Sequence, residues 1–243
     1  MTPLVRSLLP LQRLIRWIFF QLPLTPLLPS RRSIFLYRSA VLLPLLIVSS
    51  FAQADGVDYY TFALSLTPAF CDQNPQHSGS LQCRSRLPVT VHGLWPERAR
   101  GHAPDNCAGG PLSLTPALEN DLRNIMPDAG LRQYEWKKHG RCSGLAAQDY
   151  FALLSHAFTQ LKIPPLLQPR GRDTVVERQA VLSAFHRLNP GFPERGVVLR
   201  CEGRERPPLL SELRVCLTPA GQPAECTASF KPNCPVAVRI RAR

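Results

Sequence analysis

The stretch DYYTFALSL, at residues 58–66, carries the clearest structural pattern in the chain. Its even-numbered positions, from Tyr60 to Leu66, are all large and apolar, whereas its odd-numbered positions, from Tyr59 to Ser65, are smaller or more polar. Successive side chains of a strand point to opposite faces of a sheet. The alternation therefore predicts a half-buried β-strand, on which the folded part of the chain begins.

Helical patterns occupy the middle of the chain, and strand patterns return towards its end. Polar loops are predicted at residues 71–83 and 96–111. Helices are predicted at residues 115–126, 131–142, 148–161 and 174–188. The last of them would begin with a capping box of Thr174 and Glu177. Further strands are predicted at residues 87–94, 196–201, 209–217 and 237–241. This order indicates an α+β fold with a central, mainly antiparallel β-sheet flanked by helices.

Residues 1–54 have the composition of an export signal. They contain six arginines and no acidic residue, and residues 40–51 form an apolar run too short to span a bilayer. The sequence Ala52-Gln53-Ala54 then provides a small-x-small cleavage site. We expect residues 1–54 to be an N-terminal extension and signal peptide that is removed, and residues 55–243 to form a single domain. The pair Arg31-Arg32 leaves twin-arginine export as the alternative to the general secretory route.

All eight cysteines lie beyond the expected cleavage site. They are Cys71, Cys83, Cys107, Cys142, Cys201, Cys216, Cys226 and Cys234. An even number confined to the exported part predicts four disulfides in an oxidising compartment, either the periplasm or the outside of the cell. A zinc site is the alternative, although no Cys-x-x-Cys pair supports it. Spacing alone leaves the connectivity of the disulfides open.

Removal of the leader would halve the formal net charge. The whole chain carries +12, and the six arginines of residues 1–54 account for half of that charge. The remaining domain is still basic, which favours a polyanionic partner such as a nucleic acid without selecting one.

Two short segments carry side chains suited to proton transfer. The first, VHGLWP at residues 91–96, places His92 on the strand face opposite the neighbouring valines. The second, EWKKHGRC at residues 135–142, places Glu135, Lys138 and His139 on one face of a predicted helix. Cys142 lies on the same stripe, so a disulfide there would fix the helix end that carries these groups.

Cleavage of RNA needs few protein groups, because the 2′-OH of the substrate is the nucleophile. The enzyme must remove the proton of that hydroxyl, protonate the leaving 5′-oxygen and stabilise a charged phosphorane. Two histidines can perform both proton transfers near neutral pH, and a lysine can stabilise the developing charge. His92 and His139, with Lys138 and Glu135, therefore fit metal-independent RNA cleavage.

Each of these residues also has a less specific explanation. A single histidine on a strand is more often a polar residue with its hydrogen bonds satisfied, and a Glu/Lys pair on a helix is more often a solvated face. Two other functions also stay open. One is a catalytically inactive, secreted RNA-binding protein on the same scaffold, and the other is a zinc hydrolase with His92, His139 and a free cysteine as ligands.

Taken together, HGLWP at residues 92–96 and EWKKHGRC at residues 135–142 resemble the two active-site motifs of the ribonuclease T2 family, in the same order and at a fitting separation. The strand that leads to Cys71 and the segment LSELRVC at residues 210–216 are similar to the first strand and a late strand of that family. The resemblance covers residues 58–234 and implies a T2-like fold with low-specificity endoribonuclease activity on single-stranded RNA.

The resemblance also implies roles for the matching residues. His139 would be the general base on the 2′-OH and His92 the general acid on the leaving oxygen, and the two would exchange roles when the 2′,3′-cyclic phosphate is hydrolysed. Lys138 and Glu135 would assist at the phosphate. Trp95 would stack on the base 5′ to the cut.

The resemblance to the family is weaker at two expected substrate-binding residues, Glu97 and Tyr134. Glu97 stands where the family often has an acidic residue that contacts the base. The family commonly has a third histidine just before the glutamate of its second motif, and here that position holds Tyr134. Since a tyrosine donates a hydrogen bond but cannot become cationic, we expect phosphate binding and the pH optimum to differ from the family pattern.

The same resemblance implies which cysteines are paired and which partner the protein binds. The implied disulfides are Cys71–Cys83, Cys107–Cys142, Cys201–Cys234 and Cys216–Cys226. RNA is the expected partner. We expect no cofactor or metal, no obligate protein partner, no membrane span once the leader is removed, and a monomer.

Overall fold

The computed structural model describes residues 56–169, 171–227 and 232–242. The leader predicted for residues 1–54 therefore lies outside the described residues. Within the described part of the chain, no helix is both long enough and apolar enough to cross a membrane.

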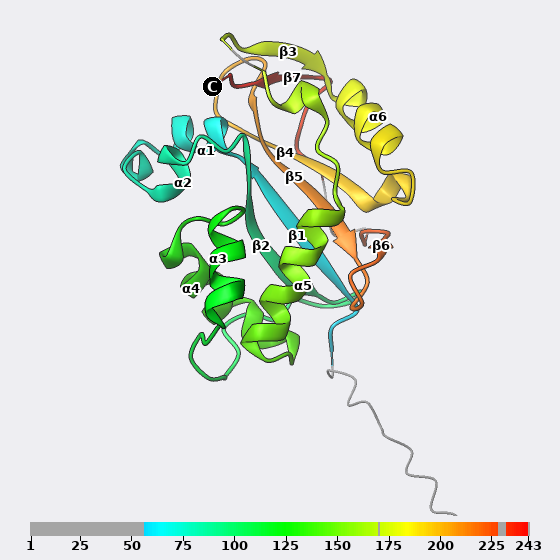
Figure 1. Ribbon diagram of the computed structural model, residues 1–243. Helices are drawn as coiled ribbons and strands as arrows, with labels where there is room; N and C mark the ends of the chain where they lie inside the picture. The colour runs from blue at the N-terminus through cyan, green and yellow to red at the C-terminus, as the bar shows by residue number, and fades with distance from the viewer. Residues whose placement is uncertain (1–55, 170, 228–231, 243) are drawn as a thin grey trace, which may run out of the picture. The chain divides into compact units, whose positions relative to one another are not determined.

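A single sheet forms the centre of this described part (Figure 1). Its strands are β1 (Tyr59–Leu66), β2 (Val89–Glu97), β3 (Thr174–Glu177), β4 (Val197–Glu202), β5 (Leu209–Leu217), β6 (Pro223–Ala224) and β7 (Ala237–Ile240). They lie in the order β2-β1-β5-β7-β3, and β4 and β6 also pair with β5. The pairings are antiparallel apart from one parallel bridge between β5 and β7. The predicted α+β fold with a mainly antiparallel sheet is confirmed.

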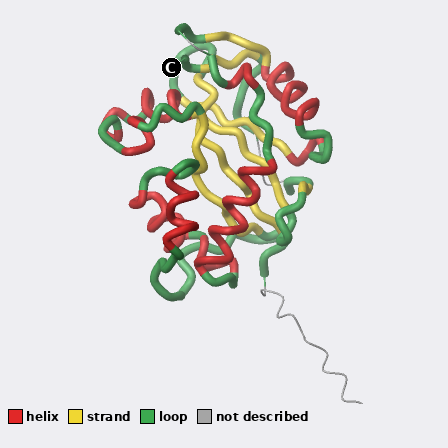
Figure 2. Tube along the Cα trace, in the orientation of Figure 1, coloured by secondary structure: helices red, strands yellow, loops and turns green. Residues whose placement is uncertain are grey.

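Helices flank this sheet on several sides. They are α1 (Thr67–Gln73), α2 (Leu81–Arg84), α3 (Pro116–Arg123), α4 (Ala129–Lys138), α5 (Ala147–Gln160) and α6 (Arg178–Leu188). Short 3-10 turns occur at Pro75–His77, Gly140–Ser143, Pro165–Leu167 and Glu194–Gly196. In Figures 1 and 2, α3, α4 and α5 gather near β1 and β2, whereas α6 lies close to β3. Of these helices, α4 supplies residues to the candidate site.

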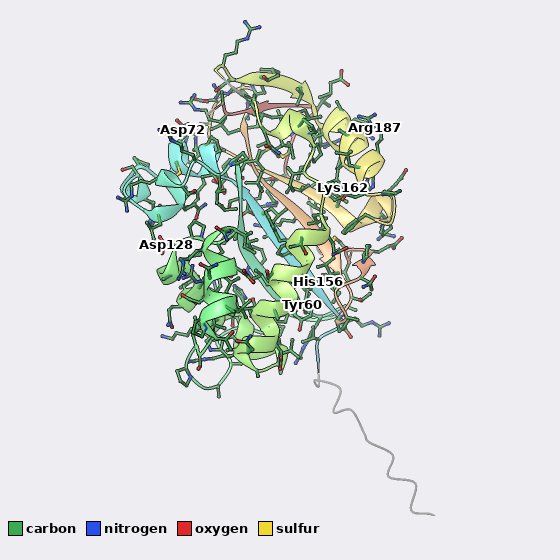
Figure 3. All side chains as sticks on the ribbon, in the orientation of Figure 1. Tyr60, Asp72, Asp128, His156, Lys162 and Arg187 are labelled. Carbon is green, nitrogen blue, oxygen red and sulfur yellow. A yellow bond between two sulfur atoms is a disulfide. The ribbon has the colours of Figure 1, made fainter. Side chains whose placement is uncertain are left out.

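β1 is buried along its whole length, and β2 and β5 pair with its two edges. Its even-numbered face, from Tyr60 to Leu66, belongs to the same core as Tyr150 and Phe151 of α5. Figure 3 labels Tyr60 of this face. The small residues of its odd-numbered face are buried as well. The alternation predicted the strand correctly, but the half-buried assignment was wrong. The odd-numbered face is covered by long side chains of the neighbouring strands.

Residues 71–83 are more helical than predicted. α1 starts with Pro68 in its first turn, and Ser80 caps α2 by accepting a hydrogen bond from the backbone N–H of Cys83 at 3.3 Å. The loop prediction for this segment was wrong. Capping and the Cys71–Cys83 bridge stabilise single turns that are too short to show apolar periodicity.

Residues 174–177 form β3 and do not start a helix. They pair with β7 from Thr174 opposite Ile240 to Glu177 opposite Ala237. Glu177 is the N-cap of α6, and no side chain accepts a capping hydrogen bond there. The predicted capping box was wrong because Val175 and Val176 are β-branched and β7 offers them a pairing edge.

Four disulfides staple the described part of the chain. They join Cys71 to Cys83, Cys107 to Cys142, Cys201 to Cys234 and Cys216 to Cys226. These are the pairs that the resemblance implies, and they use all eight cysteines.

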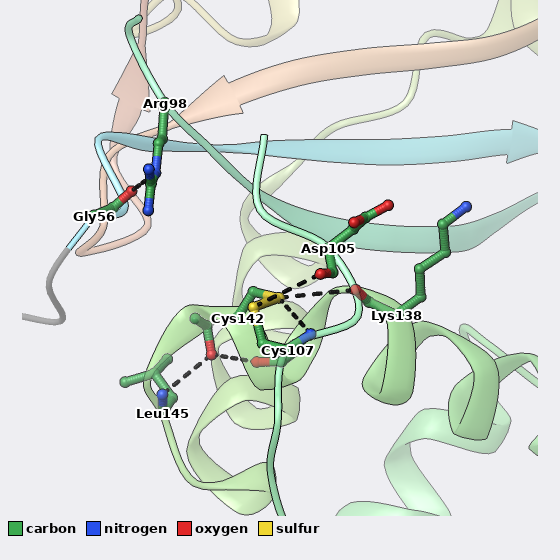
Figure 4. The surroundings of a disulfide bond; sticks show 9 residues. Gly56, Arg98, Asp105, Cys107, Lys138, Cys142 and Leu145 are labelled. Atoms are coloured by element: carbon green, nitrogen blue, oxygen red, sulfur yellow. Dashed lines mark hydrogen bonds between the residues drawn. A yellow bond between two sulfur atoms is a disulfide. The ribbon is translucent and has the colours of Figure 1, made fainter. Parts of the chain in front are cut away.

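The Cys107–Cys142 bridge joins the long loop after β2 to the turn behind α4 (Figure 4). Next to it, the backbone N–H of Asn106 donates to the carbonyl of Lys138 at 2.7 Å. The loop and the end of α4 are thus held together by a covalent bond and a hydrogen bond, directly beside His139.

Replacement of Cys107 and Cys142 by alanine should lower the free energy of unfolding by about 3–4 kcal/mol, because the bridge removes conformational freedom from the unfolded chain. It spans a sequence separation of 35 residues, against 12 for Cys71–Cys83. Denaturant titration of both double variants measures the effect. A larger loss for the Cys71/Cys83 variant would contradict this loop-length argument.

Candidate active site

The odd-numbered face of β1 forms the floor of the candidate site. Ala63 lies between Gly93 of β2 and Arg214 of β5, and Ser65 pairs with Glu212 of β5. Directly paired residues of an antiparallel sheet project on the same face. Because Ala63 and Ser65 are short, long side chains from β2 and β5 can meet above β1.

His92 is an extra residue in β2. Ala63 pairs with Gly93 and Leu64 pairs with Val91, so His92 has no partner on β1. A β-bulge of this kind bends the strand and changes the direction of a side chain. The His92 imidazole reaches across β1, where its Nδ1 lies 2.6 Å from Oε1 of Glu212. Its Nε2 lies 3.7 Å from Oε1 of Glu135 on α4.

Charged neighbours control the protonation of His92. Burial alone would lower the pKa of His92, but the hydrogen bond and the charge of Glu212, together with the charge of Glu135, outweigh it and raise the pKa above 6.5. Burial would raise the pKa of Glu212, but its bond to His92 and the nearby Arg214 lower it. Each member of the pair therefore favours the charged form of the other.

The end of α4 presents the second histidine. α4 ends at Lys138, and His139 follows with a non-helical backbone before the 3-10 turn Gly140–Ser143. The predicted helix over residues 131–142 was therefore too long. The Trp136 ring packs so closely on Gly140 that a Cβ there would overlap it, and Gly144 then takes a left-handed conformation with φ of 74°.

His139 has the opposite electrostatic environment to His92. Burial and the positive charge of Lys138 lower the pKa of His139 to about 4, with a further contribution from His92. Asp105 opposes this shift. His139 is thus neutral at pH values where His92 is still protonated.

Trp95 connects these groups. Its indole N–H donates to Oε2 of Glu135 at 2.7 Å, which fixes the orientation of the ring. The ring centroid lies 5.1 Å from that of His92 and 5.5 Å from that of His139. Burial raises the pKa of Glu135, and the charge of His92 and the Trp95 bond oppose this increase.

Six of the seven predicted catalytic and substrate-binding residues line one cleft of about 390 Å³. They are His92, Trp95, Tyr134, Glu135, Lys138 and His139. Lys138 places its ammonium 5.4 Å from the centre of the Tyr134 ring. A second cavity of about 620 Å³ shares His92 and Tyr134 with the cleft. The two cavities therefore adjoin at His92.

Glu97, the seventh predicted residue, does not line the cleft. It lies at the end of β2 and accepts a hydrogen bond from the Thr61 hydroxyl at 3.0 Å. Burial raises the pKa of Glu97, against the opposing effects of Thr61 and Arg214.

Sequence reasoning missed Glu212 and Arg214. Both lie within LSELRVC, but the segment was used only as a strand that leads to a cysteine. A glutamate inside a mostly apolar central strand is a usable signal, because a buried carboxylate needs a partner. What the sequence does not reveal is that this partner is His92, two strands away.

The disulfides exclude one of the alternatives. A zinc hydrolase with His92, His139 and a cysteine as ligands would need a free thiolate. All eight cysteines are disulfide-bonded, so this donor set does not exist.

Known proteins are similar to this chain in both sequence and fold. The model of the ribonuclease T2 family matches residues 57–226. A ribonuclease of Aeromonas hydrophila is 33% identical over 184 residues, which cover 72% of this chain and 80% of that protein. The structure of ribonuclease MC1 from the seeds of bitter gourd superposes with a TM-score of 0.60 at 25% identity, covering 74% of this chain and 98% of that one.

A mutant of ribonuclease MC1 in complex with 5′-UMP superposes with a TM-score of 0.63 at 23% identity, covering 75% of this chain and 98% of that one. The chain belongs to the ribonuclease T2 family and is an endoribonuclease of that type.

Substitution of Gly93 by alanine should reduce RNA cleavage by at least about 10²-fold, because small displacements of catalytic groups have effects of that size. A Cβ at Gly93 would overlap both Oε2 of Glu135 and Nε1 of Trp95, and so break their hydrogen bond. Steady-state kinetics measures the loss, and circular dichroism shows whether the variant is folded. Gly79→Ala is the control, because a Cβ at Gly79 meets nothing within 4 Å. Normal activity of a folded Gly93→Ala variant would contradict the prediction.

Proposed function

We propose that this chain cleaves single-stranded RNA without a metal ion, with His139 as general base and His92 as general acid. The observation that supports this most is that both histidines line one cleft in opposite surroundings, His92 bonded to the Glu212 carboxylate and His139 next to the Lys138 ammonium. The pKa of His92 is raised, whereas burial and Lys138 lower that of His139 to about 4. Between these values one imidazole can accept a proton while the other can donate one, which is the arrangement acid–base catalysis requires.

The reaction proceeds in two steps. In the first, His139 removes the proton of the 2′-OH, the 2′-oxygen attacks phosphorus, and His92 protonates the departing 5′-oxygen. A 2′,3′-cyclic phosphate remains on the upstream fragment. In the second step, His92 takes a proton from water as the water oxygen attacks phosphorus. The bond between phosphorus and the 2′-oxygen breaks, His139 returns a proton to that oxygen, and a 3′-phosphate remains. Lys138 offsets the negative charge that develops on the phosphate, and Glu135 fixes Trp95 beside both histidines.

The two adjoining cavities suit the nucleotides on either side of the cut. The mutant ribonuclease MC1 bound to 5′-UMP shows that this fold can hold a nucleotide. Trp95 offers an aromatic surface for a base, and stacking tolerates many bases, so we expect low base specificity. Tyr134 lines both cavities and can donate a hydrogen bond to a phosphate oxygen. Glu97 lies two residues beyond Trp95 on β2, so it would contact a nucleobase that reaches past the Trp95 ring.

The setting of the enzyme forms part of the proposal. Residues 55–243 act as one catalytic domain, exported to the periplasm or the outside of the cell and active as a monomer without a cofactor. The four disulfides support an oxidising compartment.

His92→Ala and His139→Ala should each reduce cleavage by roughly 10²–10⁴-fold, because each removes one proton transfer. The assay measures cleavage of single-stranded RNA in excess chelator and identifies the ends formed. His156→Ala on α5 is the control, since His156 lines neither of the two cavities. A 2′-deoxy nucleotide 5′ to the cut should block the reaction. Loss of activity in chelator, or RNA binding without cleavage, would contradict the proposal, and the second result would favour the inactive binding protein.

The pH–rate profile should be bell-shaped. Activity should be lost as the pH falls through about 4, where the base His139 becomes protonated. It should also be lost as the pH rises through the pKa of the acid His92, which lies above 6.5. Lys138→Gln should move the acidic limb to higher pH, because the charge that lowers the pKa of His139 is removed. Lys137→Gln is the matched control on the exposed side of α4. An acidic limb that stays in place in Lys138→Gln would contradict this explanation.

A further inference from the structure

We propose that Glu212 is a positioning residue for His92, and that Arg214 holds Glu212 in place. The inference rests on the proposed function, in which His92 donates a proton to the leaving oxygen. It assigns a role to two charged residues of β5 that the two active-site motifs do not contain.

The first argument is the geometry of the His92 ring. Its Nδ1 lies 2.6 Å from Glu212, whereas its Nε2 lies 3.7 Å from the nearer oxygen of Glu135. Only the first distance is a hydrogen bond. A bond at Nδ1 fixes the rotation of the ring and holds a proton on that nitrogen. Nε2 is left as the atom that exchanges protons with the substrate.

The second argument is burial. Only 9% of the Glu212 side chain is exposed, whereas 34% of the His92 side chain is exposed. A buried carboxylate on a central strand is costly unless it is paired. Glu212 is paired on both oxygens, with His92 on Oε1 and Arg214 on Oε2. A carboxylate held in this way has little freedom to follow the ring, so it can set the position of the imidazole.

Arg214 completes the arrangement on the same face of β5. Its Nε and Nη2 lie 2.7 and 2.5 Å from Oε2 of Glu212. Its guanidinium carbon lies 4.8 Å from the centre of the Trp95 ring, a distance suited to a cation–π contact. Arg214 thus contacts both the Glu212 carboxylate and the Trp95 indole. The orientations of the His92 and Trp95 rings therefore depend on Glu212 and Arg214.

The charged and titratable groups around His92 determine what Glu212 contributes. They are Glu135 and His139 from α4 and its end, and Glu212 and Arg214 from β5. Arg214 lowers the pKa of His92, while the two carboxylates raise it. If Glu212 becomes neutral, Arg214 keeps its charge and Glu135 stays at the longer distance. His92 should then release its proton at lower pH.

The test compares Glu212→Gln with the unchanged protein, both purified with their disulfides formed. Glutamine keeps the shape of the side chain and removes its charge. We expect kcat to fall by about 10²-fold with KM little changed, because the acid is misplaced and the substrate contacts are kept. The alkaline limb of the pH–rate profile should move to lower pH. Titration of the His92 ring nitrogens by ¹⁵N NMR should show the same shift.

Three further variants separate positioning from a purely structural role. Glu225→Gln makes the same change of charge at an exposed ion pair with Arg195, and should alter neither the rate nor the profile. Glu212→Asp should restore the alkaline limb while kcat stays low, because the charge returns on a shorter side chain. Arg214→Lys should lower kcat less than Glu212→Gln does, since it keeps the cation but loses the two-nitrogen contact.

The outcomes are distinct. An unchanged alkaline limb and an unchanged titration of His92 in folded Glu212→Gln would overturn the inference. If Glu212→Gln does not fold, the kcat values of Glu212→Asp and Arg214→Lys decide it, and values equal to that of the unchanged protein would overturn the inference. If the unchanged protein does not cleave RNA, the proposed function fails, and the NMR titration still shows whether Glu212 controls His92.

Discussion

The interaction on which the site depends is the hydrogen bond between His92 and Glu212, which spans the full width of β1. It exists because β2 and β5 both pair with β1, and because Ala63 and Ser65 are too short to fill the space between them. Larger residues at those positions would occupy the space in which the imidazole and the carboxylate meet. The small odd-numbered residues of β1 therefore serve the site, while its large even-numbered residues serve the core.

Two opposite electrostatic environments lie within one cleft because the two histidines come from different kinds of element. His92 projects from a strand bulge towards a carboxylate on the same sheet, which favours its charged form. His139 lies just past a helix end, partly buried and next to Lys138, which favours its neutral form. Acid–base catalysis needs one protonated and one neutral histidine at the same pH. The packing of α4 against the edge of β2 is what brings the two environments together.

Much of this could be predicted from sequence because it is local. The alternation from Tyr60 to Leu66 identified β1, and the two motifs, with Tyr134 just before the second, identified six residues that do line one cleft. The errors came where non-local contacts decide the structure. Val175 and Val176 became a strand because β7 lies beside them. Glu212 was missed for the same reason, since pairing register, and not spacing along the chain, places it beside His92.

Tyr134 bears on the same balance of charges. The family commonly has a histidine at this position, and a protonated histidine there would add a second cation close to His139. Repulsion of the kind that Lys138 already exerts would then lower the pKa of His139 further. Tyrosine avoids this repulsion, and its ring lies 5.4 Å from the Lys138 ammonium, a favourable contact for that cation. Tyrosine at this position therefore leaves the positive charges of Lys138 and His92 as the ones that lower the pKa of His139.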